Sequence, residues 1–484
     1  MIAVRINCMI RGTMKYIKNH VNNNKTGSAA RKNIRTTIIC IMFTVLILPF
    51  LLTSEAEAAS GDDYLKVGLK YGSNSVGTCT LASQEGFLLG TAEDRSFEEG
   101  MPLPAYDKIV VTNENGNIVI RDTDGVTLSA DLGSSGVVMP ADYDDDGVFY
   151  FEGNPYRGGI MFVAKPDGTL SVINYISLEH YVYGVLNAEL YHTAPMEALK
   201  AQAVAARSFA ELNLGKHDEY GFDLCTTTDC QVYKGNSGEF PETNEATDET
   251  RGELIYCHGK PVTAFYYKNS GGYTQNAEDV WANSQPYLKS VKDEYCPSYP
   301  WSASLSFGEM QDKLEAAGFQ PGKVESVSIS GRNDSGAVSE LKITGSKETV
   351  YLKKAEIRNV LGSTLIKSNM FGFTDSKTES GSLAWKISNG LETKDPGKSV
   401  YVLGGSGRAQ KLDLNLAYGS SRTSTFMLRA ASLSETVTGD TVNFSGFGYG
   451  HGVGMPQDSA VAMAQQGYSY DEILEYYYTG IEID

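Results

Sequence analysis

Positive charge is scarce in this 484-residue sequence, where 41 lysines and arginines face 59 acidic residues and the formal net charge is −18. Nucleic-acid binding needs clustered lysine and arginine to neutralise phosphates, so nucleic acid is not an expected partner. The sequence also has no G-x-S-x-G, no Walker loop, no H-E-x-x-H and no G-x-G-x-x-G in any register. These absences remove the usual support for a serine hydrolase, an NTPase, a zinc protease or a dinucleotide enzyme.

The first 60 residues have the pattern of a targeting segment. Basic residues run up to Arg35, an apolar stretch of 15 residues follows from Ile38 to Leu52, and Ala56 and Ala58 offer a cleavage site. This pattern predicts a secretory signal over residues 1–58 and a strongly acidic mature protein that is extracellular or bound to the cell wall. The alternative is an uncleaved membrane anchor, although 15 apolar residues fall short of the roughly 20 that span a bilayer.

Cysteine is also too sparse for a disulfide framework. Two of the seven cysteines lie in the expected signal, and an odd number, five, remains in an exported chain of more than 400 residues. The five are Cys79, Cys225, Cys230, Cys257 and Cys296.

Two patterns together predict an α+β fold. Short extended runs between turns rich in Gly, Asn and Asp indicate a β-rich region over residues 62–175. The pattern then becomes helical: Ser177 is a plausible N-cap for a helix that ends near Asn187. A second helix, from Pro195 to Gly215, carries alanine-rich apolar positions at i+3 and i+4 spacing, which predicts one narrow apolar face.

We expect the helical segment to open a catalytic core over residues 176–374. A Ser/Thr/Gly-rich insertion with its own strands, including Val400–Leu403, is expected over 375–440. Residues 441–484 contain a glycine-rich loop and two short helices that would complete the core. This mixed α/β C-terminal part is expected to form an open substrate groove. Capping boxes that begin at Ser306 and Ser469 mark two further helix starts.

Glu189 is the candidate catalytic residue. It lies just beyond the first predicted helix, where the negative end of the helix dipole and an apolar setting would both raise the pKa of its carboxyl group. A raised pKa suits a general acid that works near neutral pH. The alternative is an ordinary solvated glutamate at a turn.

The residues around Glu189 resemble a known family. The resemblance rests on ordered blocks at Tyr181–Leu190 (YVYGVLNAEL), Pro195–Arg207 (PMEALKAQAVAAR), Tyr266–Thr274 (YYKNSGGYT) with Glu278–Trp281 (EDVW) and Pro286–Leu288 (PYL), and Gly448–Met455 (GYGHGVGM) with Gln457. In these blocks the sequence is similar to the stage II sporulation protein D family, which also contains amidase-enhancer proteins. The blocks extend from about residue 62 to the end, and only residues 375–440 have no match.

The resemblance implies a lytic transglycosylase that acts on peptidoglycan glycan strands, with Glu189 as its single acid and base. A hydrolase would normally use a second carboxylate, for which Glu278 and Asp279 are the nearest candidates. A rival from another class is a non-catalytic wall protein that enhances an N-acetylmuramoyl-L-alanine amidase. Expected partners are therefore glycan strands and a cell-wall amidase, with a membrane involved only if the N-terminal segment stays uncleaved. Sporulation and vegetative growth both remain open as settings.

The resemblance also implies substrate contacts by a set of residues outside the helix end. They are Arg207, Ser270, Gly271, Gly272, Thr274, Glu278, Asp279 and His451. For Arg207 the alternative is a buried ion pair, and for the glycines it is a purely backbone requirement. The His451 ring is expected to hydrogen-bond a ligand or Glu189.

No cofactor is required by this chemistry, but a structural zinc is a further implication of the resemblance. His217, Cys225 and Cys230 supply three of the four N and S ligands that such a site needs. A fourth histidine is missing, since Asp229 precedes the second cysteine. A Cys225–Cys230 disulfide and free thiols are the alternatives.

Overall fold

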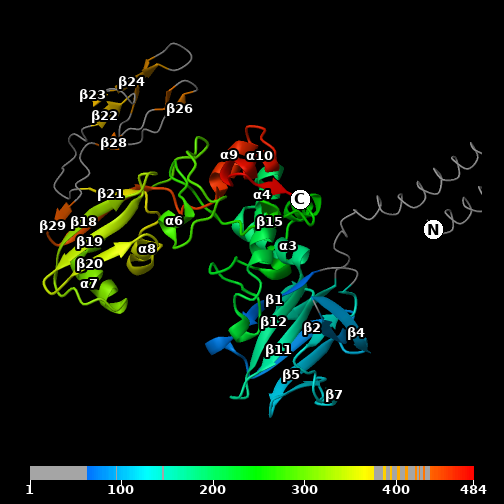
Figure 1. Cartoon of the computed structure of the whole chain (residues 1–484). Coiled ribbons are helices and arrows are strands. Elements are labelled where there is room, and N and C mark those ends of the chain that lie inside the picture. The colour runs from blue at the N-terminus through cyan, green and yellow to red at the C-terminus, as the bar shows by residue number, and fades with distance from the viewer. Residues whose placement is uncertain are drawn as a thin grey trace, which may run out of the picture. The chain divides into compact units, whose positions relative to one another are not determined.

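The computed structural model describes residues 63–93, 95–143, 147–374 and 436–484, together with the backbone of short strands between 385 and 430 (Figure 1). The expected signal over 1–58 lies outside the described residues, as do the side chains of 375–435. The described chain contains both helices and several β-sheets, which confirms the α+β prediction. Within the described ranges no helix is both long and apolar enough to cross a membrane.

Two antiparallel-rich sheets form the predicted β-rich region. In spatial order, the larger contains β13 (Leu224–Cys225), β1 (Tyr64–Lys70), β12 (Leu170–Ser177), β11 (Gly159–Ala164), β8 (Gly136–Pro140), β3 (Phe87–Glu93) and β4 (Ser96–Leu103). The smaller contains β10 (Asn154–Arg157), β9 (Val148–Phe151), β2 (Thr78–Ser83), β5 (Lys108–Glu114), β6 (Asn117–Arg121) and β7 (Thr127–Ser129). Strand β13 comes from much later in the chain and pairs in parallel with β1.

The larger sheet is buried on both faces. Successive side chains of a strand point to opposite faces, so Leu89 packs between the two sheets while Leu88 packs toward the helices on the other side. Val137 and Val138 divide in the same way. A central layer of this kind explains why β8 and β12 are buried along their whole length.

Helix α3 (Leu178–Glu189) follows β12 directly. The Ser177 hydroxyl accepts a hydrogen bond from the His180 N–H, as the predicted N-cap requires, and the helix runs two residues further than expected, so that Glu189 is its last residue. The Asn187 side chain then accepts from the His192 N–H and holds the turn that leads into the next helix.

Helix α4 (Met196–Leu212) is enclosed by the rest of the chain. Ala206 and Ala210 face the larger sheet, Ala198 and Ala203 face α3, and Ala205 belongs to a separate cluster formed with the C-terminal helices. The prediction of one narrow apolar face is therefore wrong. Alanine permits close approach on every side, and hydropathy spacing alone did not indicate how many neighbours would use it.

Shorter elements complete the part of the chain around α4. They are α5 (Pro241–Glu249), β14 (Ile255–Cys257), β15 (Lys260–Pro261), β16 (Tyr266–Tyr267), α6 (Ala277–Val280), β31 (Met455–Pro456), α9 (Gln457–Ala464), α10 (Tyr470–Tyr477), β32 (Glu482–Ile483) and 3-10 turns at Gly72–Asn74, Asp218–Tyr220 and Gly235–Gly238. Figure 1 shows α9 and α10 (red) beside α4, where Ala460, Met463 and Ile473 join its alanines in one cluster.

A second hydrophobic cluster is built from later residues. Its elements are β17 (Pro300–Ser306), α7 (Phe307–Ala316), β18 (Val324–Arg332), β19 (Val338–Gly345), β20 (Thr349–Lys353), α8 (Glu356–Leu361), β21 (Phe371–Phe373), β29 (Thr436–Thr438) and β30 (Thr441–Phe447). The capping boxes at Ser306 and Ser469 are both present. Because this cluster has its own core, residues 300–374 pack together with 436–447, which lie beyond the expected catalytic core.

The region of the expected insertion contains short strands. They are β22 (Trp385–Ser388), β23 (Thr393–Lys394), β24 (Val400–Leu403), β25 (Ala409–Leu412), β26 (Ser420–Ser421), β27 (Ser424–Thr425) and β28 (Arg429–Ala430). The predicted strand at Val400–Leu403 is confirmed as β24.

A buried ion pair joins α3 to α4. Arg207 is fully buried, its Nε and Nη2 atoms donate to the two carboxylate oxygens of Glu179 at 2.8 and 2.7 Å, and it also donates to the carbonyls of Thr247 and Glu253. Of the two roles considered for Arg207, the structure has the buried ion pair, so the substrate-binding prediction for Arg207 is wrong.

Removing the charge of Glu179 should strongly destabilise the protein. Glu179→Gln leaves the buried Arg207 guanidinium without its counter-ion, and we expect the free energy of unfolding to fall by about 3–5 kcal/mol in a urea titration. The matched control is Glu114→Gln, which removes the partner of Arg121 at the surface and should leave the midpoint essentially unchanged. Equal midpoints for both variants would contradict the assignment.

Candidate active site around Glu189

Glu189 lies at the C-terminal end of α3, where two distant segments contact it. The backbone N–H of Val232 donates to its carboxylate at 3.0 Å. The side-chain amide of Gln457, from the start of α9, donates to the Glu189 backbone carbonyl at 3.0 Å. Within the described ranges no lysine, arginine or histidine lies within ion-pair distance of this carboxylate.

The pKa of Glu189 is raised, as predicted. Burial is the main cause, and hydrogen bonds from Val232 and Gln457 lower the pKa by less. Because no cation offsets the cost of desolvation, the protonated form is favoured to a higher pH than in an ordinary glutamate. A raised pKa favours a carboxyl group that donates a proton and takes one back.

A buried glutamine organises the side chains below Glu189. The Gln231 amide accepts from the Tyr181 hydroxyl at 3.2 Å and donates to the Tyr266 hydroxyl oxygen at 2.8 Å. Burial raises the pKa of both phenols, and the charge of Glu189 raises it further. Both tyrosines therefore remain neutral and lie close to the carboxylate that they help to surround.

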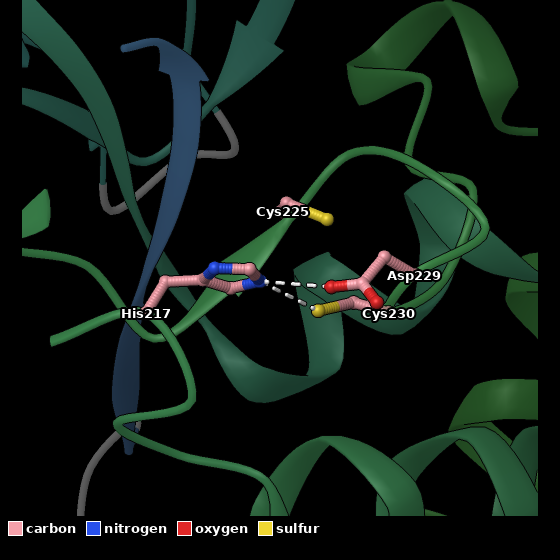
Figure 2. A group of neighbouring side chains, drawn as sticks. All are labelled: His217, Cys225, Asp229 and Cys230. Atoms are coloured by element: carbon pink, nitrogen blue, oxygen red, sulfur yellow. Dashed lines mark hydrogen bonds and ion pairs between the residues drawn. The ribbon is translucent and has the colours of Figure 1, made fainter. Parts of the chain in front are cut away.

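The segment that ends at Val232 begins in a cluster of potential metal ligands (Figure 2). The Nε2 atom of His217 is 3.3 Å from the Cys230 sulfur and 3.4 Å from a carboxylate oxygen of Asp229. One ligand atom from each of these residues and from Cys225 lies within 4.8 Å of the others. Asp229 thus supplies a fourth potential ligand atom, where the sequence pattern indicated only three.

The two cysteines of this cluster are free thiols, so the disulfide alternative is wrong for this structure. The Cys230 thiol donates to the Cys225 sulfur, and this hydrogen bond lowers the pKa of Cys225. Metal ions bind the thiolate form of cysteine. Two sulfurs, an imidazole nitrogen and a carboxylate oxygen are together a donor set that fits zinc.

The two glycine-rich segments, residues 269–274 (the first) and 446–454 (the second), lie against each other. Asn269 and Tyr449 exchange backbone hydrogen bonds of 3.0 and 2.9 Å, and β16 pairs in parallel with β31 just beyond them. Gly271 has a φ of +68°, and a Cβ atom there would lie 2.8 Å from the Phe447 carbonyl oxygen. Glycine is therefore required at this position both by the backbone conformation and by the close approach. Whether the two segments line an open groove stays a prediction.

The side chains of the first glycine-rich segment are used inside the protein. Ser270 donates to the buried carboxylate of Asp293 at 2.6 Å, and Ser459 and Tyr477 donate to the same carboxylate. Thr274 is also buried and accepts from the Val291 N–H. The hydroxyls of Ser270 and Thr274 are therefore not directed at a substrate, contrary to prediction. Gly272 has no atoms around its Cβ position and is open to a ligand.

His451 is held by the backbone. Its Nδ1 atom accepts from the Val453 N–H at 3.1 Å, and its Nε2–H donates to the Tyr266 carbonyl at 3.1 Å. With both ring nitrogens in use, the expected hydrogen bond to a ligand or to Glu189 is not made. Burial, together with the charge of Arg358, lowers the pKa of His451 to about 4.

Glu278 and Asp279 lie on α6 and are engaged there. Lys289 lies 2.8 Å from a carboxylate oxygen of Glu278 and lowers its pKa, while Asp279 accepts from the Asn276 side chain. A lowered pKa is the opposite of what a general acid needs. Among the described contacts, none joins either carboxylate to Glu189.

The most important contacts of Glu189 were missed from the sequence. Val232 acts through its backbone N–H, which carries no residue-specific signal. Gln457 stood beside a matched motif, but its contact with Glu189 spans 268 residues of sequence. Only Asp229 had a usable signal, because it lies within the same short stretch as the two cysteines.

Comparisons with known proteins agree on one family. The family model described as stage II sporulation protein matches residues 166–256, and one described as a domain of unknown function matches residues 295–390. The chain is 30% identical over 323 residues to stage II sporulation protein D of Bacillus subtilis, covering 64% of this chain and 74% of that protein. It is 30% identical to an uncharacterized protein of Brachyspira hyodysenteriae, covering 69% of this chain and 74% of the relative.

A further relative has a different name. The chain is 29% identical over 352 residues to the amidase enhancer of Bacillus subtilis, which covers 72% of this chain. The chain spans only 46% of that relative's length.

The stability of the protein should fall as His451 is forced to accept a proton. Its pKa in the folded state, about 4, is below the ordinary value of 6.5, so protons bind the unfolded state more strongly. The free energy of unfolding should therefore decrease by up to about 3 kcal/mol as the pH falls from 6.5 through 4. Urea titrations at several pH values should show a shallower decrease for His451→Gln. An unchanged pH slope would exclude His451 as its source.

Proposed function

Because the chain belongs to the stage II sporulation protein D family, we propose that it is an exported lytic transglycosylase that cleaves peptidoglycan glycan strands. The bond cleaved joins N-acetylmuramic acid to N-acetylglucosamine, and the product carries a 1,6-anhydromuramoyl end. The names of the relatives favour a role in the cell wall and in sporulation.

One observation carries the proposal. Glu189 combines a raised pKa, a fixed position at the end of α3 and no paired cation among the described residues. A carboxyl group in this state can give up a proton and later accept another without a change of partner. Those are the two transfers that a lytic transglycosylase asks of one residue.

In the first step the protonated Glu189 carboxyl donates its proton to the glycosidic oxygen. The bond between that oxygen and the muramoyl C1 breaks, and positive charge develops on the sugar ring. The Val232 N–H then hydrogen-bonds the newly formed carboxylate, which limits the cost of creating a charge in a partly buried site.

In the second step the same carboxylate accepts the proton of the muramoyl C6 hydroxyl. The C6 oxygen bonds to C1 and closes the anhydro ring, while Glu189 returns to its protonated form. No water is consumed, so a second carboxylate to activate one is unnecessary. Glu278 pairs with Lys289 and Asp279 accepts from Asn276, which is consistent with a mechanism that needs no second carboxylate.

We also propose that His217, Cys225, Asp229 and Cys230 hold a structural zinc ion. The donor set and the short distances between its atoms support this assignment. Bound zinc would cross-link the ends of the 217–230 loop. Cys230 leads directly through Gln231 to Val232, so the fixed loop would in turn fix the N–H that contacts Glu189.

The alternative is a non-catalytic enhancer of a cell-wall amidase, and the similarity to a protein of that name favours it. The two classes differ in what the purified chain does alone. An enzyme releases anhydro products from glycan, whereas an enhancer releases none and speeds an added amidase.

Glu189→Gln should abolish the release of anhydromuramoyl products. Glutamine keeps the size of the side chain but cannot transfer a proton, and general acid–base assistance is worth about 10²–10⁴-fold. The assay is mass spectrometry of products from purified glycan strands. With wild-type protein the rate should also decline as the pH rises above the raised pKa of Glu189, because the protonated form is lost.

The matched control is Glu242→Gln, which removes an exposed carboxylate beside His192 and should leave product release unchanged. Full activity of Glu189→Gln would move catalysis to another residue. Products with ordinary reducing ends would indicate a hydrolase and return attention to Glu278 and Asp279. If the wild-type protein releases no product but increases the rate of an added amidase, the enhancer is favoured.

Metal analysis should find about one zinc ion per chain, and Cys230→Ser should lose it. Chelation should lower the midpoint of thermal unfolding of the wild-type protein but not of this variant, because the zinc contributes to folding stability. Cys257→Ser is the control, since Cys257 is buried in another cluster. Retention of zinc by Cys230→Ser would refute the assignment.

A further inference from the structure

A lysine lies between two tyrosine rings where the later part of the chain meets the second glycine-rich segment. The Lys367 ammonium group is 5.5 Å from the ring centroid of Tyr299 and 5.8 Å from that of Tyr449. The two ring centroids are 6.0 Å apart, with the ring planes tilted by 37°. All three side chains are partly exposed. We call these three residues the Lys367 cluster.

Backbone hydrogen bonds fix the cluster in place. The Gly448 N–H donates to the Tyr299 carbonyl, and the Gly450 N–H donates to the Lys367 carbonyl, both at 2.9 Å. The glycines on either side of Tyr449 therefore bind the backbone of the other two members. The backbones that carry the rings and the ammonium group are therefore held together, which lowers the cost of ordering these side chains around a ligand.

The Lys367 ammonium has no carboxylate within ion-pair distance among the residues that the structure describes. Lys354, another partly buried lysine without a carboxylate partner in the described ranges, donates to the Glu278 and Trp281 carbonyls instead. Lys268 pairs with Asp458, and Lys289 pairs with Glu278. The Lys367 ammonium instead faces the two tyrosine rings, whose faces attract a cation.

A second cation, Arg358, lies near the Tyr449 ring. Arg358 donates through Nε to the Ile366 carbonyl at 2.9 Å, and no carboxylate in the described part of the chain pairs with it. Its charge lowers the pKa of His451, and Tyr449 in turn influences the pKa of Arg358. Two positive charges that have no carboxylate partner among the described residues thus lie near Tyr449, in a protein whose net charge is −18.

We propose that the Lys367 cluster, with Arg358, is a binding subsite for a carboxylate-bearing sugar of the glycan strand. The tyrosine rings offer flat faces to a sugar ring, and the ammonium and guanidinium groups offer partners to its carboxylate. The identity of the polymer rests on the proposed function. In peptidoglycan the carboxylate is either the lactyl group of a muramoyl residue or part of its stem peptide.

The chain connects the cluster to Glu189 over a short distance. Tyr449 and Gln457 stand on one segment, and Gln457 contacts the Glu189 backbone. Eight residues separate them, so the two positions are at most roughly 28 Å apart along a fully extended chain. A glycan of several sugars could therefore reach both. Residues 295–390, which the family model of unknown function matches, supply Lys367, Tyr299 and Arg358.

The competing interpretation is that the cation–π contacts of the cluster only hold the Tyr449 loop against the segments that carry Tyr299 and Lys367. Both interpretations predict some loss of stability when Lys367 is changed. Only the subsite predicts that binding depends on the charge of the ligand.

The test measures binding of full-length mature protein to three probes: peptide-free glycan strands, strands with intact stem peptides, and a neutral N-acetylglucosamine oligomer. Lys367→Met should weaken binding of at least one carboxylate-bearing probe about tenfold and leave the neutral oligomer unchanged. Loss confined to peptide-free strands identifies the lactyl carboxylate, and loss confined to peptide-bearing strands identifies the stem peptide. Both results support the subsite.

Lys367→Arg should restore binding, since it keeps the charge. Lys347→Met makes the same change of charge at an exposed position of the same part of the chain and should have no effect. Salt offers a measurement that needs no variant: 0.5 M NaCl should weaken wild-type binding of the carboxylate-bearing probes more than that of the neutral oligomer. If Lys367→Met or added salt weakens the binding of all three probes equally, or weakens the binding of none, the proposal is overturned.

The outcome is separable from that of the proposed function. Binding is measured without turnover, so it can be scored in Glu189→Gln protein as well as in wild type. A chain that releases no anhydro product but discriminates by charge keeps the subsite and loses the enzyme. A chain that releases product but binds all probes alike keeps the enzyme and loses the subsite.

Discussion

Helix α4 must be enclosed by three other parts of the chain at once, and this constraint determines much of what surrounds Glu189. The larger sheet, α3 and the C-terminal helices each pack against a different set of its alanines. A larger residue at any of these positions would have to displace a packed neighbour, because interiors of this density hold few voids. The one fully buried charged side chain of α4, Arg207, is tolerated because Glu179 neutralises it there.

The setting of Glu189 follows from this packing. With α3 fixed against α4, its last residue is held partly out of solvent and its carboxyl group gains proton affinity from burial. The 217–232 loop and α9 then contact Glu189 from positions 43 and 268 residues further along the chain. The carboxyl group is thus carried by a helix, and one of its contacts comes from an irregular loop while the other comes from the first residue of α9. This arrangement is common in active sites.

Another buried carboxylate joins the first glycine-rich segment to the C-terminal helices. Asp293 accepts hydrogen bonds from Ser270, Ser459 and Tyr477, which belong to the first glycine-rich segment, α9 and α10. These hydroxyls satisfy a charge that would otherwise be costly to bury. The small residues around Ser270 and Tyr449 allow the two glycine-rich segments to touch through their backbones. Because this contact uses backbone groups, the Tyr449 side chain is available to the Lys367 cluster.

The sequence by itself determined features that depend on a few neighbouring residues. Ser177 caps α3, the boxes at Ser306 and Ser469 start helices, and Glu189 stands at a helix end, because each needs only a short local pattern. The tertiary structure alone decided that Arg207 is buried, that His451 is satisfied by backbone groups and that the Val232 N–H faces Glu189. Those outcomes join residues far apart in the chain, and the Val232 contact comes from the backbone, which is chemically the same at nearly every position. Hydropathy and spacing therefore cannot encode them, and only the packed chain specifies which groups meet.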